Sequence, residues 1–121
     1  MCGIIGVLNK GNRQSVRAAL DLISHRGPDD KQIIQKDGTV LGHTRLAIQD
    51  LSDLGRQPMI SACGRFIIVF NGEIYNIPEL REHPFTNSVS LRGTSDTEIL
   101  LDFLAYSIKN QCSFSIALEK L

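Results

Sequence analysis

The order of the elements that the sequence predicts, a strand, a helix, several strands and then helices, indicates an α/β or α+β fold. Two observations support this prediction. Short runs rich in Ile and Val, bounded by glycine and turn residues, predict the strands, and apolar residues at helical spacing predict the helices. A chain of 121 residues is at most one domain, or part of one, and can bury roughly two thirds of its unfolded surface.

The first part of the chain predicts a strand, a helix and a hairpin. Residues 3–8, rich in Ile, Val and Gly, predict a buried strand whose close backbone neighbours require glycine. Residues 13–25 carry apolar side chains at helical spacing, and residues 26–30 end this helix with turn residues. Asp37-Gly38 separates two pairs of aliphatic residues, which is a strong hairpin signal.

The middle of the chain predicts two further strands and a short helix. Residues 46–51 predict a short strand. Residues 66–70 are continuously apolar and predict a strand buried on both faces. Residues 77–82 predict a short helix with Pro78 in its first turn.

The last part of the chain is predicted to be helical. Residues 95–98, Ser-Asp-Thr-Glu, form a capping-box pattern that predicts the start of a helix. The apolar residues that follow share one helical face, namely Leu100, Phe103, Leu104 and Ile108. Residues 110–113 predict a break before a last short helix through Leu121.

Composition indicates a protein that is neither a nucleic-acid binder nor a membrane protein. The hydrophobic fraction is 42% and the charged fraction is 21%, as in soluble globular proteins. The 13 basic and 13 acidic residues balance, which predicts neither a nucleic-acid nor an anionic-membrane partner. No apolar run approaches the 18 or so residues that span a bilayer, and no basic-then-apolar leader is present. We therefore expect a cytoplasmic protein.

The cysteines and histidines predict neither disulfides nor a metal site. The three cysteines are an odd number and widely spaced, whereas a disulfide framework normally uses an even number. No Cys-x-x-Cys pair occurs, and His25, His43 and His83 lack ligand spacing. Cys63 and Cys112 are expected to be passive small hydrophobes.

Cys2 is the most informative residue. Removing the initiator Met would leave a thiol and a free α-amino group on one residue, and Cys is small enough to permit this trimming. An α-amine titrates near pH 8 and can take the proton of a thiol that attacks a carbonyl. One residue can thus supply both nucleophile and general base. Taken alone, a Cys in this position is more often an ordinary small residue. Lipidation of the cysteine would need a preceding apolar signal segment, and myristoylation would need a glycine after Met1; the sequence has neither.

Five spaced segments together form a recognisable motif pattern. They are Cys2-Gly3-Ile4, His25-Arg26-Gly27-Pro28-Asp29, Arg45-Leu46-Ala47-Ile48, Asn71-Gly72-Glu73-Ile74-Tyr75-Asn76 and Ser95-Asp96-Thr97-Glu98. In this order and over nearly the whole chain, they resemble the class II glutamine amidotransferases, and within these the N-terminal glutaminase domain of asparagine synthetase-like enzymes. The resemblance implies an α+β fold of the N-terminal-nucleophile type, an αββα sandwich of stacked antiparallel sheets, with residues 1–121 as a partial glutaminase domain.

The resemblance also implies the catalytic residues. In that family the N-terminal cysteine attacks the side-chain amide of glutamine, so Cys2 is the implied nucleophile and its amine the implied base. Asn71, through its side-chain amide, and Gly72, through its backbone N–H, are the implied donors to the oxyanion. Taken without the other segments, Asn-Gly after an apolar strand is more typical of a plain hairpin turn.

The resemblance implies two charged partners for the substrate. Arg45 matches the family's carboxylate clamp, because a guanidinium can bind a carboxylate bidentately, and Asp96 matches the acceptor of the α-ammonium group. Taken alone, Arg45 is more typical of a surface strand and Asp96 of a helix first turn. The other implied pocket residues are Leu46, Ile48, Gln49, Asn71, Gly72 and Glu73. The residues expected to act as scaffold are Ile4, Arg26, Gly27 and Asp29.

The chain ends where the family usually continues. The resemblance therefore implies a sandwich that is incomplete at its C-terminal end and a missing ATP-dependent synthetase domain. No cofactor is expected in this chain, and ATP and Mg²⁺ would belong to that synthetase domain or to a separate synthetase chain. Two hypotheses remain: a module that hydrolyses glutamine through a Cys2 thioester, and a non-catalytic remnant or partner-dependent fragment. The ammonia acceptor stays undetermined, and a homodimer stays open.

Overall fold

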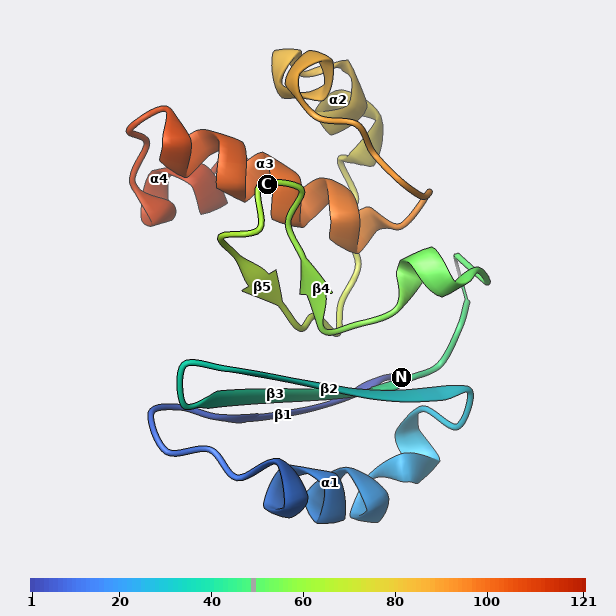
Figure 1. Cartoon of the computed structure of the whole chain (residues 1–121). Helices are drawn as coiled ribbons and strands as arrows, with labels where there is room; N and C mark the ends of the chain where they lie inside the picture. The colour runs from blue at the N-terminus through green and yellow to red at the C-terminus, as the bar shows by residue number, and fades with distance from the viewer. Residues whose placement is uncertain (49) are drawn as a thin grey trace.

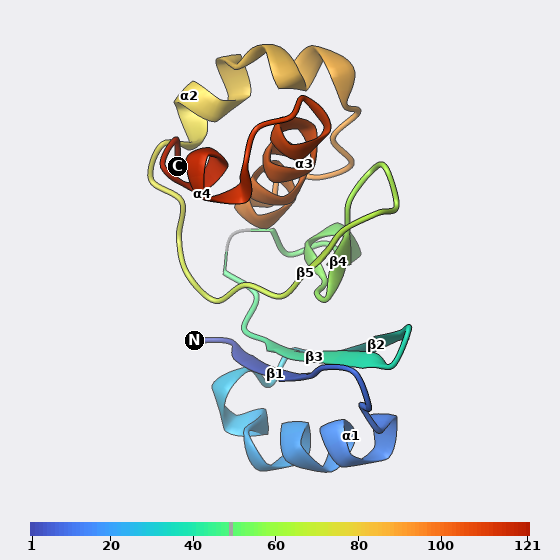
Figure 2. The same ribbon diagram turned by 90° about the vertical axis from the view of Figure 1, so that its left-hand side faces the viewer.

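Helix α1 (Arg13–Leu22) covers one face of a three-stranded antiparallel sheet in the computed structural model, which describes residues 1–48 and 50–121. The strand order is β1 (Gly3–Val7), β3 (Thr39–Arg45), β2 (Asp30–Lys36). A second, two-stranded sheet lies on the other side, and the C-terminal helices lie beyond it (Figure 1). The turned view in Figure 2 shows the same succession of helix, sheet, sheet and helices. The fold is therefore α+β with antiparallel sheets, as the sequence predicts.

The β2–β3 hairpin forms where Asp-Gly predicts it. Asp37 and Gly38 both adopt positive φ angles, 50° and 77°, as a two-residue turn of this kind requires. A Cβ on Gly38 would come within 2.8 Å of the carbonyl oxygen of Asn9, so the loop before α1 also requires glycine here.

Helix α1 begins at a side-chain cap and packs on the sheet through one face. The Asn12 carboxamide oxygen accepts hydrogen bonds from the N–H groups of the first turn. Val16 and Leu20 then pack against Ile33 and Val40 of the sheet. The helix ends at Leu22 and a 3₁₀ turn spans Ser24–Arg26, so the predicted helix over residues 13–25 is divided in two.

The second sheet is shorter than the sequence predicts. Its strands are β4 (Met59–Ile60) and β5 (Ile67–Ile68), and the run over residues 66–70 is only half-buried. Among the described residues β5 pairs with β4 alone, and of its two side chains Ile68 packs against the cluster that contains Leu100 and Leu104 of α3. The predicted strand over residues 46–51 is wrong for the part that the structure describes, because β3 ends at Arg45.

The C-terminal helices build the second core. They are α2 (Ile77–Glu82), α3 (Asp96–Lys109) and α4 (Phe114–Leu118), with 3₁₀ turns at Asp53–Gly55 and Pro84–Ser88. Leu80, Phe85, Ile99 and Phe103 form one buried cluster. Leu100, Leu104 and Ala117 form another, which covers the second sheet. None of the helices among the described residues is both long and apolar enough to cross a bilayer.

Helix α3 starts where the capping box predicts, but by a different device. The Ser95 side chain makes no capping hydrogen bond, and Glu98 does not reach back to it. The buried Glu98 carboxylate instead accepts hydrogen bonds from the backbone N–H groups of Arg92 and Gly93, 2.9 and 2.8 Å away. Burial raises the pKa of Glu98, but the hydrogen bond from the Arg92 guanidinium, 2.8 Å away, together with the two backbone hydrogen bonds, outweighs burial and lowers the pKa overall.

Candidate functional site

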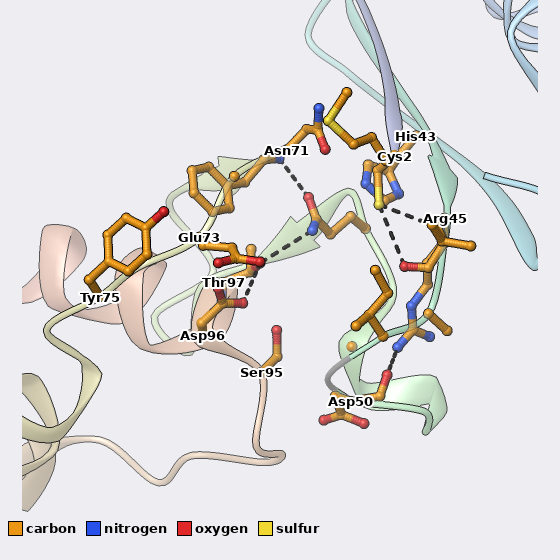
Figure 3. Close-up of a pocket in the computed structure, with 18 residues that line it drawn as sticks. Cys2, His43, Arg45, Asp50, Asn71, Glu73, Tyr75, Ser95, Asp96 and Thr97 are labelled. Carbon is orange, nitrogen blue, oxygen red and sulfur yellow. Dashed lines mark hydrogen bonds between the residues drawn. The ribbon is translucent and has the colours of Figure 1, made fainter. Parts of the chain in front are cut away.

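A pocket of about 480 Å³ lies between the end of β3 and the start of α3. Its volume is in the range of small-molecule sites. Cys2, His43 and Arg45 lie on one side of it, and Glu73, Asp96 and Thr97 lie on the other (Figure 3). The remaining lining residues include Met1, Leu46, Ala47, Ile48, Asp50, Gln57, Phe70, Asn71, Gly72 and Tyr75.

Cys2 is held in place by the strand pairing of its neighbour. Gly3 pairs with Thr44 and donates its N–H to the Thr44 hydroxyl over 3.1 Å. A Cβ on Gly3 would come within 2.6 Å of that hydroxyl, so only glycine permits this approach. The Cys2 sulfur contacts the Leu46 peptide, 3.4 Å from its nitrogen and 3.8 Å from its oxygen. Arg26, a predicted scaffold residue, donates to the Cys2 carbonyl over 3.2 Å.

The loop after β3 is shaped by Arg45. Its guanidinium is buried, with 8% exposure, and donates to the backbone carbonyls of Asp50 and Ser52. These contacts use two of the five N–H donors of the group. Asp29, another predicted scaffold residue, accepts the N–H of Ala47 over 2.8 Å. Backbone groups after Arg45 thus bind side chains, which explains why no strand follows.

Asp50 joins this loop to the segment before α3. One carboxylate oxygen accepts from the N–H and hydroxyl of Ser52, at 2.8 and 2.6 Å. The other accepts from the N–H and hydroxyl of Thr94, at 3.1 and 3.3 Å. Hydrogen bonds from Ser52 lower the pKa of Asp50 to about 2 against the effect of burial, and those from Thr94 add to this. The carboxylate therefore ties together the two walls that carry Arg45 and Asp96.

Replacing Asp50 with asparagine is expected to lower the free energy of unfolding by about 2 kcal/mol. An amide cannot accept four hydrogen bonds on two oxygens, and its NH₂ group would face N–H or hydroxyl donors. Chemical denaturation measures the change. Asp53→Asn is the matched control, because Asp53 is an exposed neighbour whose carboxylate, among the residues that the structure describes, pairs with exposed Arg56. Equal stability of the two variants would refute the role of Asp50.

Gln57 makes a second bridge, between the segment that carries Asn71 and helix α3. Its buried carboxamide accepts the N–H of Phe70 over 2.6 Å and donates to the Thr97 hydroxyl over 3.3 Å. Sequence reasoning missed both Asp50 and Gln57. Each has one partner 40 or more residues away in the chain, Thr94 for Asp50 and Thr97 for Gln57, and no local spacing predicts such contacts.

Asn71 and Gly72 are exposed residues on the pocket wall and do not form a hairpin turn. Neither has a positive φ angle, and no strand follows them among the described residues. The plain-turn alternative is therefore wrong. Glu73 lies next to them, also exposed and lining the pocket.

Asp96 is the first residue of α3 and is half-buried at the pocket. One of its oxygens accepts the Thr97 N–H over 2.7 Å. The other lacks a hydrogen-bond partner among the described residues but is not buried. Cationic Arg45 lies on one wall of the pocket, and acidic Glu73 and Asp96 lie on the other (Figure 3). This arrangement of charges fits a zwitterionic ligand.

The pocket gathers every site residue that the sequence predicts within the described part of the chain. These are Cys2, Arg45, Leu46, Ile48, Asn71, Gly72, Glu73 and Asp96. Ile48 lies at the rim with 73% exposure. Gln49 lies outside the described residues. In the part of the chain that the structure covers, no group of three or more His, Cys, Asp or Glu side chains is arranged to hold a metal ion.

His43 is a pocket residue to which the sequence assigns no role. It is 1% exposed, and burial lowers its pKa to about 4. The Phe70 backbone and Asp30 oppose this shift, whereas Arg45 adds to it. The imidazole is therefore neutral near pH 7.

The depressed pKa of His43 predicts an acid-sensitive fold. Between about pH 4 and its ordinary value of 6.5, this histidine binds a proton only in the unfolded chain. Its contribution to the free energy of unfolding is therefore complete above pH 6.5 and falls as the pH drops toward 4, by on the order of 3 kcal/mol in all. Urea unfolding at pH 7 and pH 5 should show a larger loss for the native chain than for His43→Gln. The exposed His25→Gln variant should behave as native, and identical losses in all three would refute the assignment.

The comparisons with known proteins agree on one family. A family model described as a glutamine amidotransferase domain matches residues 1–112. Asparagine synthetase [glutamine-hydrolyzing] 3 of Bacillus subtilis (strain 168) is 37% identical over 110 residues, covering 84% of this chain and 17% of the relative. A putative asparagine synthetase [glutamine-hydrolyzing] 2 of Methanocaldococcus jannaschii is 38% identical over 122 residues, covering 84% and 23%. A probable asparagine synthetase [glutamine-hydrolyzing] of Dictyostelium discoideum is 39% identical over 107 residues, covering 84% and 19%. The chain thus spans about a fifth of the length of these relatives.

Proposed function

The chain belongs to the glutamine amidotransferase domain family, and from this we propose that it hydrolyses L-glutamine to glutamate and ammonia with Cys2 as the nucleophile. The observation that carries the proposal is the pocket itself. Its walls contain a thiol, an arginine, a carboxylate at a helix start and an Asn-Gly pair, each contributed by a different segment.

The proposed reaction has two halves. After removal of Met1, which lies beside the pocket with 74% exposure, the Cys2 amine takes the thiol proton as the sulfur attacks the amide carbon. The C–N bond breaks, ammonia leaves with that proton, and a γ-glutamyl thioester remains on Cys2. Water then attacks the thioester, which releases glutamate and restores the thiol. Asn71 and Gly72 donate hydrogen bonds to the oxyanion in both halves.

The charges of the pocket support glutamine as the ligand. Arg45 is the proposed partner of the α-carboxylate, with three N–H donors left after its loop contacts. Asp96 is the proposed partner of the α-ammonium, with Glu73 on the same side of the pocket in Figure 3. Leu46 and Ile48 also line the pocket, and Gln49 is proposed as a further substrate-binding residue.

The layer order supports an N-terminal-nucleophile sandwich. The nucleophile directly precedes the first strand, and helix, sheet, sheet and helices follow one another in Figure 1.

We extend the proposal to the use of ammonia. The names of the relatives pair glutamine hydrolysis with asparagine synthesis, which supports delivery of the ammonia to an ATP- and Mg²⁺-dependent synthetase unit.

The test is the stoichiometry of hydrolysis by the chain itself. Incubation with L-glutamine should release glutamate and ammonia in equal amounts, and D-glutamine should release neither. L-Glutamine that binds, as judged by calorimetry, but releases no ammonia would instead identify a binding module without turnover.

Asp96→Asn is expected to raise the KM for glutamine by about 10- to 100-fold while kcat changes little. The substitution removes a charge-assisted hydrogen bond to the α-ammonium, which is far from the scissile amide. The ground state and the transition state therefore lose the same binding energy. Steady-state kinetics of ammonia release measure both constants. Asp53→Asn is the control for loss of an acidic residue outside the pocket. A fall in kcat at constant KM would contradict the assigned role.

A further inference from the structure

His43 lies on the same face of the sheet as the proposed nucleophile. Along β3, Val40 and Gly42 face α1, so His43 and Arg45 face the pocket. Pairing of His43 with Ile4 and of Thr44 with Gly3 places Cys2 diagonally next to His43. Figure 3 draws Cys2 and His43 on the same side of the pocket.

The imidazole is buried, and its ring nitrogens make no hydrogen bond of ordinary geometry in the described part of the chain. The Phe70 backbone raises the pKa of the ring as a weak polar neighbour, but its contact lacks the geometry of a hydrogen bond. A buried polar atom left unpaired costs about 1–3 kcal/mol, so such atoms are normally satisfied by protein, water or ligand. The pocket is the open volume that adjoins this ring.

We propose that His43 contacts the substrate and accepts a hydrogen bond from the NH₂ group of the scissile carboxamide. This inference rests on the proposed glutamine hydrolysis. If Asn71 and Gly72 hold the carboxamide oxygen, the planar amide directs its NH₂ group away from them, toward the β3 wall that carries His43. A neutral imidazole offers one acceptor nitrogen, whereas an imidazolium would offer none. Arg45 two residues away disfavours a second positive charge at this wall.

The discriminating substrate is glutamate γ-methyl ester, which has the same acyl group as glutamine but no amide N–H. His43→Phe keeps a ring of similar size without an acceptor. It should lower kcat/KM for glutamine about tenfold or more, and for the ester by less than about twofold. His43→Gln, whose carbonyl oxygen can accept, should recover part of the activity on glutamine. Equal losses on amide and ester would assign His43 to packing and overturn the proposal.

A second measurement needs no His43 variant. In the Cys2→Ala chain, the ring nitrogens of His43 can be followed by ¹⁵N NMR during addition of glutamine or glutamate. Glutamine should shift the acceptor nitrogen, and glutamate, which has no amide N–H, should shift it much less. Shifts of the Asn71 and Gly72 amides without a shift of His43 would overturn this proposal alone. The absence of any shift at saturating glutamine would overturn the proposed function and this inference with it.

Discussion

Replacing Cys2 with alanine is expected to reduce ammonia release from glutamine by at least about 10³-fold, the largest effect of any single substitution in this chain. Alanine removes the atom that would form the thioester, while the rest of the pocket remains. The rate of the Cys2→Ser variant should lie between those of the native chain and Cys2→Ala, because a hydroxyl is a weaker nucleophile than a thiol. Initial rates of glutamate and ammonia formation measure the series.

The other two cysteines supply matched controls. Cys63 is exposed and Cys112 is half-buried, and neither lines the pocket. Cys63→Ser and Cys112→Ser should therefore retain the native rate. Thermal unfolding of Cys2→Ala should remain close to native, since the thiol makes only weak contacts with the Leu46 peptide. Equal rates for native and Cys2→Ala chains would contradict thiol chemistry at this residue.

Asn71→Ala is expected to lower kcat by about 10²- to 10³-fold with little change in KM. Its side-chain amide is proposed to stabilise charge that develops only as the sulfur attacks, which is the usual size of effect for one oxyanion donor. Asn71→Asp should be worse than Asn71→Ala, because a carboxylate cannot donate and repels the oxyanion. Asn87→Ala, an exposed residue in the Pro84–Ser88 turn, is the control. An Asn71→Asp variant as active as native would contradict the assignment.

The elements that the sequence predicts best are those with local causes. The hairpin turn depends on the positive φ angles of Asp37 and Gly38 themselves. Helix α1 depends on its Asn12 cap and on apolar side chains that lie within three helical turns of one another. The strand predicted over residues 66–70 is shorter and less buried than expected. An apolar run shows that the side chains can be buried, whereas their actual burial depends on how many layers cover the strand. The capping box marked the start of α3 correctly, but Glu98 binds Arg92 and Gly93, a competition that spacing alone does not reveal.

The residues of the candidate site also fall into those that the sequence predicts and those that it does not. Resemblance located the residues of the pocket rim and walls, and the structure brings the described ones together. It did not reveal Asp50, Gln57 or His43. Asp50 and Gln57 bridge the pocket walls through Thr94 and Thr97, which are distant in sequence, and the burial of His43 is visible only in the folded chain. Long-range contacts of this kind emerge from tertiary packing, which a local pattern does not encode.

Intact-mass analysis of the native chain, quenched in acid during glutamine turnover, tests the central claim most directly. The account predicts a chain that has lost Met1 and a fraction that carries one γ-glutamyl group, mapped by peptide sequencing to Cys2. A chain that retains Met1 while it releases ammonia, or an adduct on Cys63 or Cys112, would contradict the claim that Cys2 is both nucleophile and base.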